Sequence, residues 1–147
     1  ILPMMNERIS TIMTKNVVTV HPEDSLEVVK SLLFEKHFHH LPVVDADGKL
    51  AGIITSWDLI KSNKRFEEYG NFKVSDLMTV KVASLGPNDS VGAAAMVFLR
   101  HLFHGVPIVD ETNRLVGIVT THDLLKYEFK KEYPDDVFVK ETHWVED

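Results

Sequence analysis

The chain has 147 residues, 44% of them hydrophobic, with a net charge of −6 and no cysteine. This length is typical of one domain or two tightly packed half-domains, and the lack of cysteine excludes disulfides and thiolate zinc sites. No apolar run approaches the ~20 residues that span a membrane. The N-terminus lacks signal-peptide features, so we expect a cytoplasmic protein. An acidic chain without a Lys/Arg block is also not expected to bind nucleic acid.

The sequence contains a tandem repeat. The segment Ile9–Lys61 aligns without a gap on Val74–Lys126, and 19 of the 53 aligned positions are identical. Two copies are too few for a solenoid, which needs about three or more repeats to bury a continuous core. We therefore predict two similar units at 9–61 and 74–126, packed face to face with a binding site in the cleft between them. A charged linker is expected at 62–73, and a helix end with an acidic tail at 127–147.

In chain order, each repeat is predicted to form a short helical turn, then strand, helix, strand, strand and helix. Repeat one is expected to have its turn at 9–14, strands at 16–20, 41–45 and 50–55, and helices that begin near Asp24 or Ser25 and at Ser56. Repeat two is expected to have its turn at 74–79, strands at 81–85, 106–110 and 115–120, and helices at 90–101 and 121–131. β-Branched runs predict the strands, and apolar residues at helical spacing predict the helices. The fold class is therefore α+β.

One motif recurs where the last strand of each repeat meets the last helix. It reads Gly52-Ile-Ile-Thr-Ser-Trp-Asp58 in repeat one and Gly117-Ile-Val-Thr-Thr-His-Asp123 in repeat two. Thr-x-x-Asp is typical of a helix capping box, in which two side chains satisfy free backbone donors. The same geometry also suits a nucleotide, because a helix N-terminus attracts phosphate and a carboxylate can accept both ribose hydroxyls. A glycine at the strand start would let a flat base approach the backbone.

Taken in order, these motifs resemble a tandem pair of CBS domains, the family named after cystathionine β-synthase. The resemblance rests on Ile12-Met-Thr14 and Leu77-Met-Thr79, on Leu41-Pro-Val-Val-Asp45 and Val106-Pro-Ile-Val-Asp110, and on the two Gly-x-x-Thr-x-x-Asp motifs. It implies two βαββα units packed as a pseudo-twofold module with clefts between them. It also implies a regulatory sensor module, without catalysis, that binds an adenosine ligand such as AMP, ADP, ATP or S-adenosylmethionine.

The resemblance further implies which residues bind this ligand. The candidates are Asp58 and Asp123 for the ribose, Thr55, Thr120, His39, His40 and His104 for the phosphate, Ile53 and Ile118 beside the base, and His21 and Gly86 in the adenine pocket. Arginine often stands near the phosphates in this family, whereas histidines and Gly105 stand there in this chain. An imidazole with the ordinary pKa near 6.5 is mostly neutral at pH 7. This favours a ligand with few phosphates, or a pH-sensitive affinity.

Two alternatives to a ligand sensor stay open. One is a dimerisation or structural module without a ligand, in which Thr-x-x-Asp serves only as a capping box. The other is a metal or pH sensor built on the histidine cluster, which comprises His37, His39, His40, His101 and His104. No Cys or Glu-x-x-His pattern supports a dedicated metal site, so we expect none.

Three further expectations concern activity, assembly and one aromatic residue. The sequence has no phosphate-binding glycine loop of the common enzyme families and no nucleophile elbow, so we expect no enzyme activity and no catalytic cofactor. Apolar residues on more than one face of the helical segments 28–34 and 93–99 predict a homodimer. The sequence does not name a regulated partner protein. Trp57, inside the first motif, is expected to be a packed aromatic.

Overall fold

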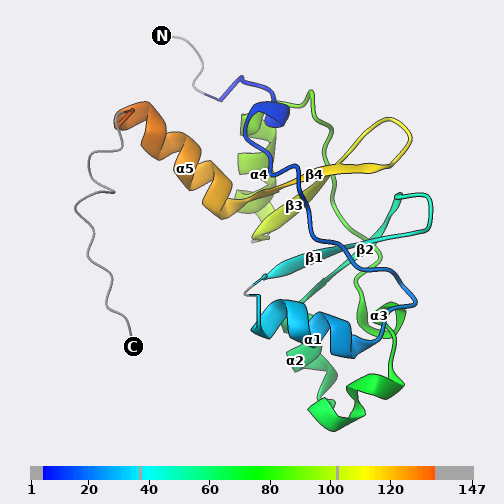
Figure 1. The fold of residues 1–147 in the computed structure, drawn as a ribbon. Coiled ribbons are helices and arrows are strands. Elements are labelled where there is room, and N and C mark those ends of the chain that lie inside the picture. Colours follow the sequence, from blue (N-terminus) through cyan, green and yellow to red (C-terminus); the bar gives the residue numbers. More distant parts are fainter. Residues whose placement is uncertain (1–4, 37, 102, 135–147) are drawn as a thin grey trace.

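The computed structural model describes residues 5–36, 38–101 and 103–134. Two small units of helices and strands lie next to each other, repeat one below repeat two in the view of Figure 1. Repeat one contains α1 (Leu26–Phe34), β1 (His40–Val44), β2 (Leu50–Thr55) and α2 (Ser56–Ser62). Repeat two contains α4 (Val91–His101), β3 (Gly105–Val109), β4 (Leu115–Thr120) and α5 (Thr121–Glu132). The turns η1 (Ile9–Thr11) and η2 (Phe66–Asn71) and the short helix α3 (Val74–Leu77) complete the described elements. The predicted α+β fold is confirmed.

The two predicted hairpins form in the same register. β1 pairs antiparallel with β2, and β3 pairs antiparallel with β4, with Pro42 opposite Ile53 and Pro107 opposite Ile118. Both hairpin turns contain a residue in the left-handed region, where Gly48 has φ 80° and its counterpart Asn113 has φ 66°. Glycine and asparagine are the residues that adopt this conformation most readily. The two turns also contact each other, because the backbone N–H of Leu115 donates to the Gly48 carbonyl at 3.0 Å.

The first strand of each repeat is much shorter than predicted. Only Val20 and Leu85 pair with the hairpins, each through one isolated parallel bridge. The reason is that the preceding residues cross from one unit to the other. Thr14 is bonded to Ile118 of β4 in repeat two, whereas Val20 is bonded to β1 in repeat one. The residues between them span the gap between the repeats, so their β-branched side chains do not extend a sheet.

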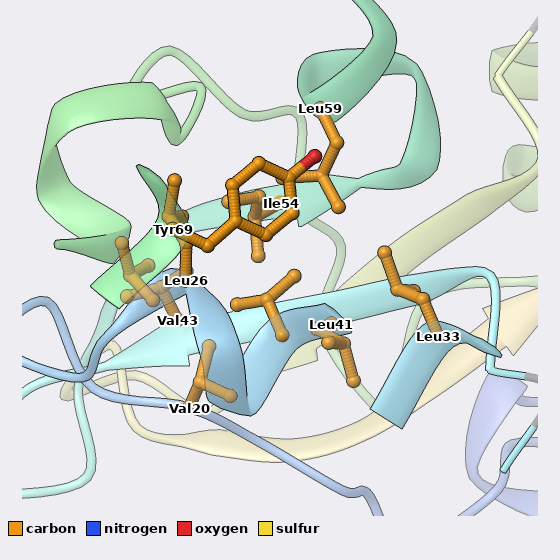
Figure 2. Close-up of a cluster of buried hydrophobic side chains, with 10 residues drawn as sticks. Val20, Leu26, Leu33, Leu41, Val43, Ile54, Leu59 and Tyr69 are labelled. Atoms are coloured by element: carbon orange, nitrogen blue, oxygen red, sulfur yellow. The ribbon is translucent and has the colours of Figure 1, made fainter. Parts of the chain in front are cut away.

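The turn that begins each repeat packs into the core of the other repeat. Ile9 of η1 lies in the second core with Phe98 of α4 and Val106 of β3. Val74 of α3 lies in the first core, and both Ile9 and Val74 are fully buried. Figure 2 shows the first core, whose labelled side chains are Val20, Leu26, Leu33, Leu41, Val43, Ile54, Leu59 and Tyr69. Burial of such a side chain stabilises the fold by about 1.5–3 kcal/mol, so this exchange ties the two units together.

Within the described residues, no helix has both the length and the apolar character needed to cross a bilayer.

Candidate functional site

The recurring motif of repeat one forms the capping box that its sequence predicts. Thr55 donates to Asp58 Oδ2 twice, from its backbone N–H at 2.9 Å and from Oγ1 at 3.2 Å. The Asp58 N–H donates back to Thr55 Oγ1 at 3.4 Å. This exchange begins α2 directly after β2 and holds the Asp58 side chain in one orientation. Asp58 is buried, with 5% of its surface exposed.

Repeat two builds the same frame. The Thr120 N–H and Oγ1 donate to Asp123 Oδ2 at 2.9 and 3.1 Å, and the Asp123 N–H donates to Thr120 Oγ1 at 3.1 Å. Asp123 is as buried as its counterpart. The second capping box is therefore also confirmed, and the two halves of the molecule share one local hydrogen-bond pattern.

The other carboxylate oxygen of each aspartate is held by a residue from the crossing segment. Thr79 Oγ1 donates to Asp58 Oδ1 at 3.4 Å, and Thr14 Oγ1 donates to Asp123 Oδ1 at 3.5 Å. Thr79 belongs to the Met-Thr pair near the start of repeat two, and Thr14 to the pair near the start of repeat one. Sequence reasoning assigned these threonines no role, although the recurrence of the pair was visible. The crossing therefore connects each motif to the chain of the other repeat.

A lysine one turn further along each helix completes the environment of the carboxylate. Lys61 Nζ lies 3.8 Å from Asp58 Oδ1, and Lys126 Nζ lies 3.7 Å from Asp123 Oδ1. Both lysines are more than half exposed, so these ion pairs are well solvated and contribute little to stability. Lys61 and Lys126 nevertheless bring a positive charge to each motif, and neither lysine was among the predicted site residues.

The motif glycines make room for the crossing segments rather than for a ligand base. A Cβ on Gly52 would lie 2.6 Å from the backbone oxygen of Thr79. A Cβ on Gly117 would lie 2.6 Å from Met13 Sδ and 3.0 Å from the Thr14 oxygen. The expectation that these glycines admit a flat base is therefore wrong, because the crossing segments already occupy that space.

A cavity of about 970 Å³ opens at the motif of repeat one, near the upper end of the ~300–1,000 Å³ typical of small-molecule sites. Repeat one contributes His39, His40, Ile53, Thr55, Trp57 and Asp58 to its lining. The crossing segment contributes Thr79, Lys81, Val82 and Ala83. Repeat two contributes Phe103, His104, Gly105, Thr120, Thr121 and His122. Both repeats therefore form the walls of a single cavity.

Four of the predicted binding residues lie outside this lining. Ile118 and Asp123 are buried in repeat two. His21 Nδ1 lies 2.8 Å from the Val44 oxygen, and the Gly86 N–H donates to Asp89 Oδ2 at 2.7 Å. For Gly86 the reason is the path of the crossing segment, because Lys81, Val82 and Ala83 line the cavity and Leu85 then pairs with Ile108 of β3.

Three histidines meet at the seam between the repeats. The ring of His40 lies 6.3 Å from that of His104 and 6.5 Å from that of His39, centre to centre. Burial, followed by the charges of His104 and His39, lowers the pKa of His40 to about 4. His40 is therefore neutral at pH 6–8, which contradicts the expectation that it pairs with phosphate as an imidazolium. Gly105, its counterpart, makes room for it, since a Cβ there would lie 3.2 Å from His40 Cγ.

The described residues contain no group of three or more His, Asp or Glu side chains placed to hold a metal ion. His37, which the sequence analysis included in the histidine cluster, lies outside the described residues.

Two features of the cavity were missed or misjudged from sequence. Lys61 and Lys81 both line it, although neither lysine was among the predicted phosphate-binding residues. Trp57 also lines it and is 63% exposed, so the expectation of a packed aromatic is wrong. The cavity lining therefore contains two lysines and an exposed indole in addition to the predicted residues.

The CBS domain family matches this chain twice, at residues 9–64 and 74–130, and the chain belongs to that family. Among solved structures, it is similar to a CBS domain pair in complex with 5′-methylthioadenosine and S-adenosyl-L-methionine, with 32% identity and a TM-score of 0.74. That match covers 86% of this chain and 98% of the other. It is also similar to CBSX2 in complex with AMP, with 26% identity, a TM-score of 0.76, and coverage of 85% and 98%.

The curated relatives are much longer proteins. The chain is 35% identical over 116 residues to a homoserine O-acetyltransferase of Methanococcoides burtonii, which covers 79% of this chain and 23% of that enzyme. It is 38% identical over 127 residues to an inosine-5′-monophosphate dehydrogenase of Bifidobacterium longum, which covers 84% and 22%. The chain thus spans less than a quarter of either enzyme, and the matched region is the CBS part.

Proposed function

We propose that this chain is a regulatory module that binds an adenosine ligand in the cavity at the Asp58 motif and does not transform it. The observation that carries the proposal is the cavity itself, which brings Ile53, Thr55 and Asp58 into one lining with residues of repeat two. The structural neighbours in complex with AMP or with S-adenosylmethionine and methylthioadenosine support the ligand class.

In this proposal each lining group has a distinct task. Asp58, fixed by its capping box, accepts hydrogen bonds from the ribose hydroxyls and exchanges its contacts with Thr79 and Lys61 for them. Thr55 Oγ1 turns its one proton from Asp58 Oδ2 to a phosphate oxygen, while the backbone N–H groups of Thr55 and Asp58 keep the capping box. The half-buried Ile53 flanks the base. Because both repeats line the cavity, the ligand binds best to one relative position of the two units. It shifts their equilibrium only by its difference in affinity for the alternative positions.

Isothermal titration with adenosine, AMP, ADP and ATP tests the proposal. We expect dissociation constants between micromolar and millimolar, and no release of phosphate above the buffer rate. Failure of every adenosine compound to bind at millimolar concentration would refute the ligand proposal. Catalysed phosphate release would refute the proposal that the module does not transform its ligand.

A structural module without ligand is the second candidate, and one observation favours it. Both oxygens of Asp58 already have partners within the protein, namely Thr55 and Thr79 with Lys61 nearby. If capping is the whole role, Asp58→Asn lowers stability and adenosine compounds do not bind. Native mass spectrometry of freshly purified protein separates the two candidates, because a retained adenosine compound supports the sensor.

We also propose that the chain forms a homodimer. Several large apolar side chains are exposed on its helices, with Ile60 of α2 69%, Leu125 of α5 67% and Leu99 of α4 81% exposed. The proposal takes these side chains to form contiguous apolar surface, which is typical of an interface. Light scattering at low micromolar concentration is expected to give about twice the 16.7 kDa of one chain. A monomer mass that does not change on addition of AMP or ATP would refute the dimer.

A further inference from the structure

We propose that the cavity takes one anionic adenosine nucleotide per chain and that Lys81 binds its phosphate. This inference rests on the proposed function and specifies which class of adenosine ligand the cavity binds. The ligands named for the structural neighbours differ in charge. AMP carries nearly two negative charges at pH 7, methylthioadenosine is neutral, and S-adenosylmethionine carries a positive sulfonium. The charge of the cavity decides among them.

The cavity lining is positive in a protein that is negative as a whole. Among the described residues that line it, Lys61 and Lys81 are cations and Asp58 is the one carboxylate. The formal charge of the lining is therefore +1, whereas the chain carries −6. A cavity whose lining has a net charge of one sign favours ligands of the opposite sign. The positive lining would repel a sulfonium and attract a phosphate.

Lys81 is the cation that remains available for a ligand. Lys61 lies beside Asp58, whereas none of the ion pairs among the described residues involves Lys81. Its position is well fixed, because Thr79, two residues earlier, exchanges backbone hydrogen bonds of 2.8 and 2.9 Å with Ile53. Lys81 therefore extends from an anchored segment at the cavity wall, and a phosphate would give it its first strong partner.

The Asp123 half lacks the features that would make a second site of the same kind. Asn16 stands where the Asp58 half has Lys81, and Val18 stands where it has Ala83. Ala83 lines the cavity, whereas Val18 packs against the first core. Ile118 is 7% exposed and lies outside the lining, although its counterpart Ile53 lines the cavity. The additional positive charge of Lys81 and the accessible isoleucine thus occur together in one half.

The test compares three ligands on three proteins by isothermal titration at pH 8, where imidazoles with ordinary pKa values are neutral. The ligands are AMP, methylthioadenosine and S-adenosylmethionine. The proteins are the unaltered chain, Lys81→Asn, which installs the residue found at position 16, and Lys49→Asn as a matched control. Lys49 is exposed directly before β2 and is not part of the lining.

We expect AMP to bind most tightly and S-adenosylmethionine least. Lys81→Asn should weaken AMP about fivefold to tenfold, the loss expected for a charge-assisted hydrogen bond at an accessible site. It should leave methylthioadenosine unchanged, and Lys49→Asn should change neither. Equal effects of Lys81→Asn on AMP and methylthioadenosine, or tighter binding of either sulfur compound than of AMP, would overturn this inference alone. If none of the three binds, the proposed function falls with it.

Discussion

The Asp58 half and the Asp123 half of this molecule have the same hydrogen-bond frame but different surroundings. In both, a threonine and an aspartate form a capping box, a crossing threonine reaches the second carboxylate oxygen, and a lysine lies within 4 Å. The large cavity, however, opens at Asp58. Residues that the two repeats share therefore build the frame, and residues that they do not share decide where a ligand has room.

Two of the pairs that differ between the repeats have a visible consequence at the cavity. His40 fills the seam where its counterpart is Gly105, so the two hairpins approach closely there. Trp57 is exposed at the cavity where its counterpart is His122, which lines the same cavity from the other side. Such differences between the repeats accompany the opening of the cavity at Asp58.

The largest expected effect separates the two aspartates by their role in binding. Asp58→Ala should weaken AMP binding by about 1.5–3 kcal/mol, as for a lost hydrogen bond to a charged group. Asp123→Ala should change it less than threefold, although the family resemblance assigns both residues to the ribose. Each variant should lose about 1 kcal/mol of folding stability with its cap. Isothermal titration and urea denaturation measure the two effects. Equal weakening of AMP binding by both variants would contradict the claim that the two halves differ in ligand binding.

A second expectation compares the motif glycines. Gly52→Ala should lower the free energy of unfolding by about 2–3 kcal/mol, within the cost typical of overpacking, because the new methyl group meets a backbone oxygen at 2.6 Å. Gly117→Ala should cost about 1–2 kcal/mol, since its nearest neighbour is the flexible end of Met13. Gly70→Ala is the control, because nothing lies within 4 Å of its added methyl group. Equal losses at the two motif positions, or a larger loss at Gly117, would contradict the packing described here.

A third expectation concerns acid stability and His40. The unfolded chain binds a proton at this residue near pH 6.5, whereas the folded chain binds it at about pH 4. The unfolded state thus binds more protons between these values, so stability is full above pH 6.5 and decreases as the pH falls towards 4. His40→Gln should reduce this decrease by about 1–2 kcal/mol, measured by urea denaturation across the window. His101→Gln, at the exposed end of α4, is the control. An unchanged pH profile in His40→Gln would show that the seam tolerates a charged imidazole.

The smallest expected effect is the pH dependence of AMP binding. His39 and His104 line the cavity, and an imidazole that contacts phosphate binds it more tightly when it is protonated, so we expect a higher affinity at pH 6 than at pH 8. His40 adds nothing here, because it is neutral over this range. We expect a change of about twofold to fivefold, since the phosphate itself gains protons near pH 6. Titrations at both pH values measure it, and adenosine, which lacks phosphate, should show no change. An AMP affinity that is the same at pH 6 and pH 8 would show that neither histidine contacts the phosphate.

Local patterns in the sequence predicted most of the frame. The hairpins, the helices and both capping boxes follow from short-range rules of turn chemistry, periodicity and capping. The run Asn16–Val20 misled the strand prediction, because β-branched residues favour strands but the chain must cross between the repeats there. The places of Lys81 and Trp57 could not be predicted, since a cavity is formed by segments distant in sequence. The Met-Thr pairs were the one visible signal of the crossing contacts.

Counting the nucleotides bound per chain tests most directly whether the Asp58 half alone holds a ligand. Native mass spectrometry at saturating AMP should show one nucleotide per chain, retained in Asp123→Ala and strongly reduced in Asp58→Ala. Two nucleotides per chain in the unaltered protein, or one that persists in Asp58→Ala and disappears in Asp123→Ala, would contradict the division of roles between the two repeats.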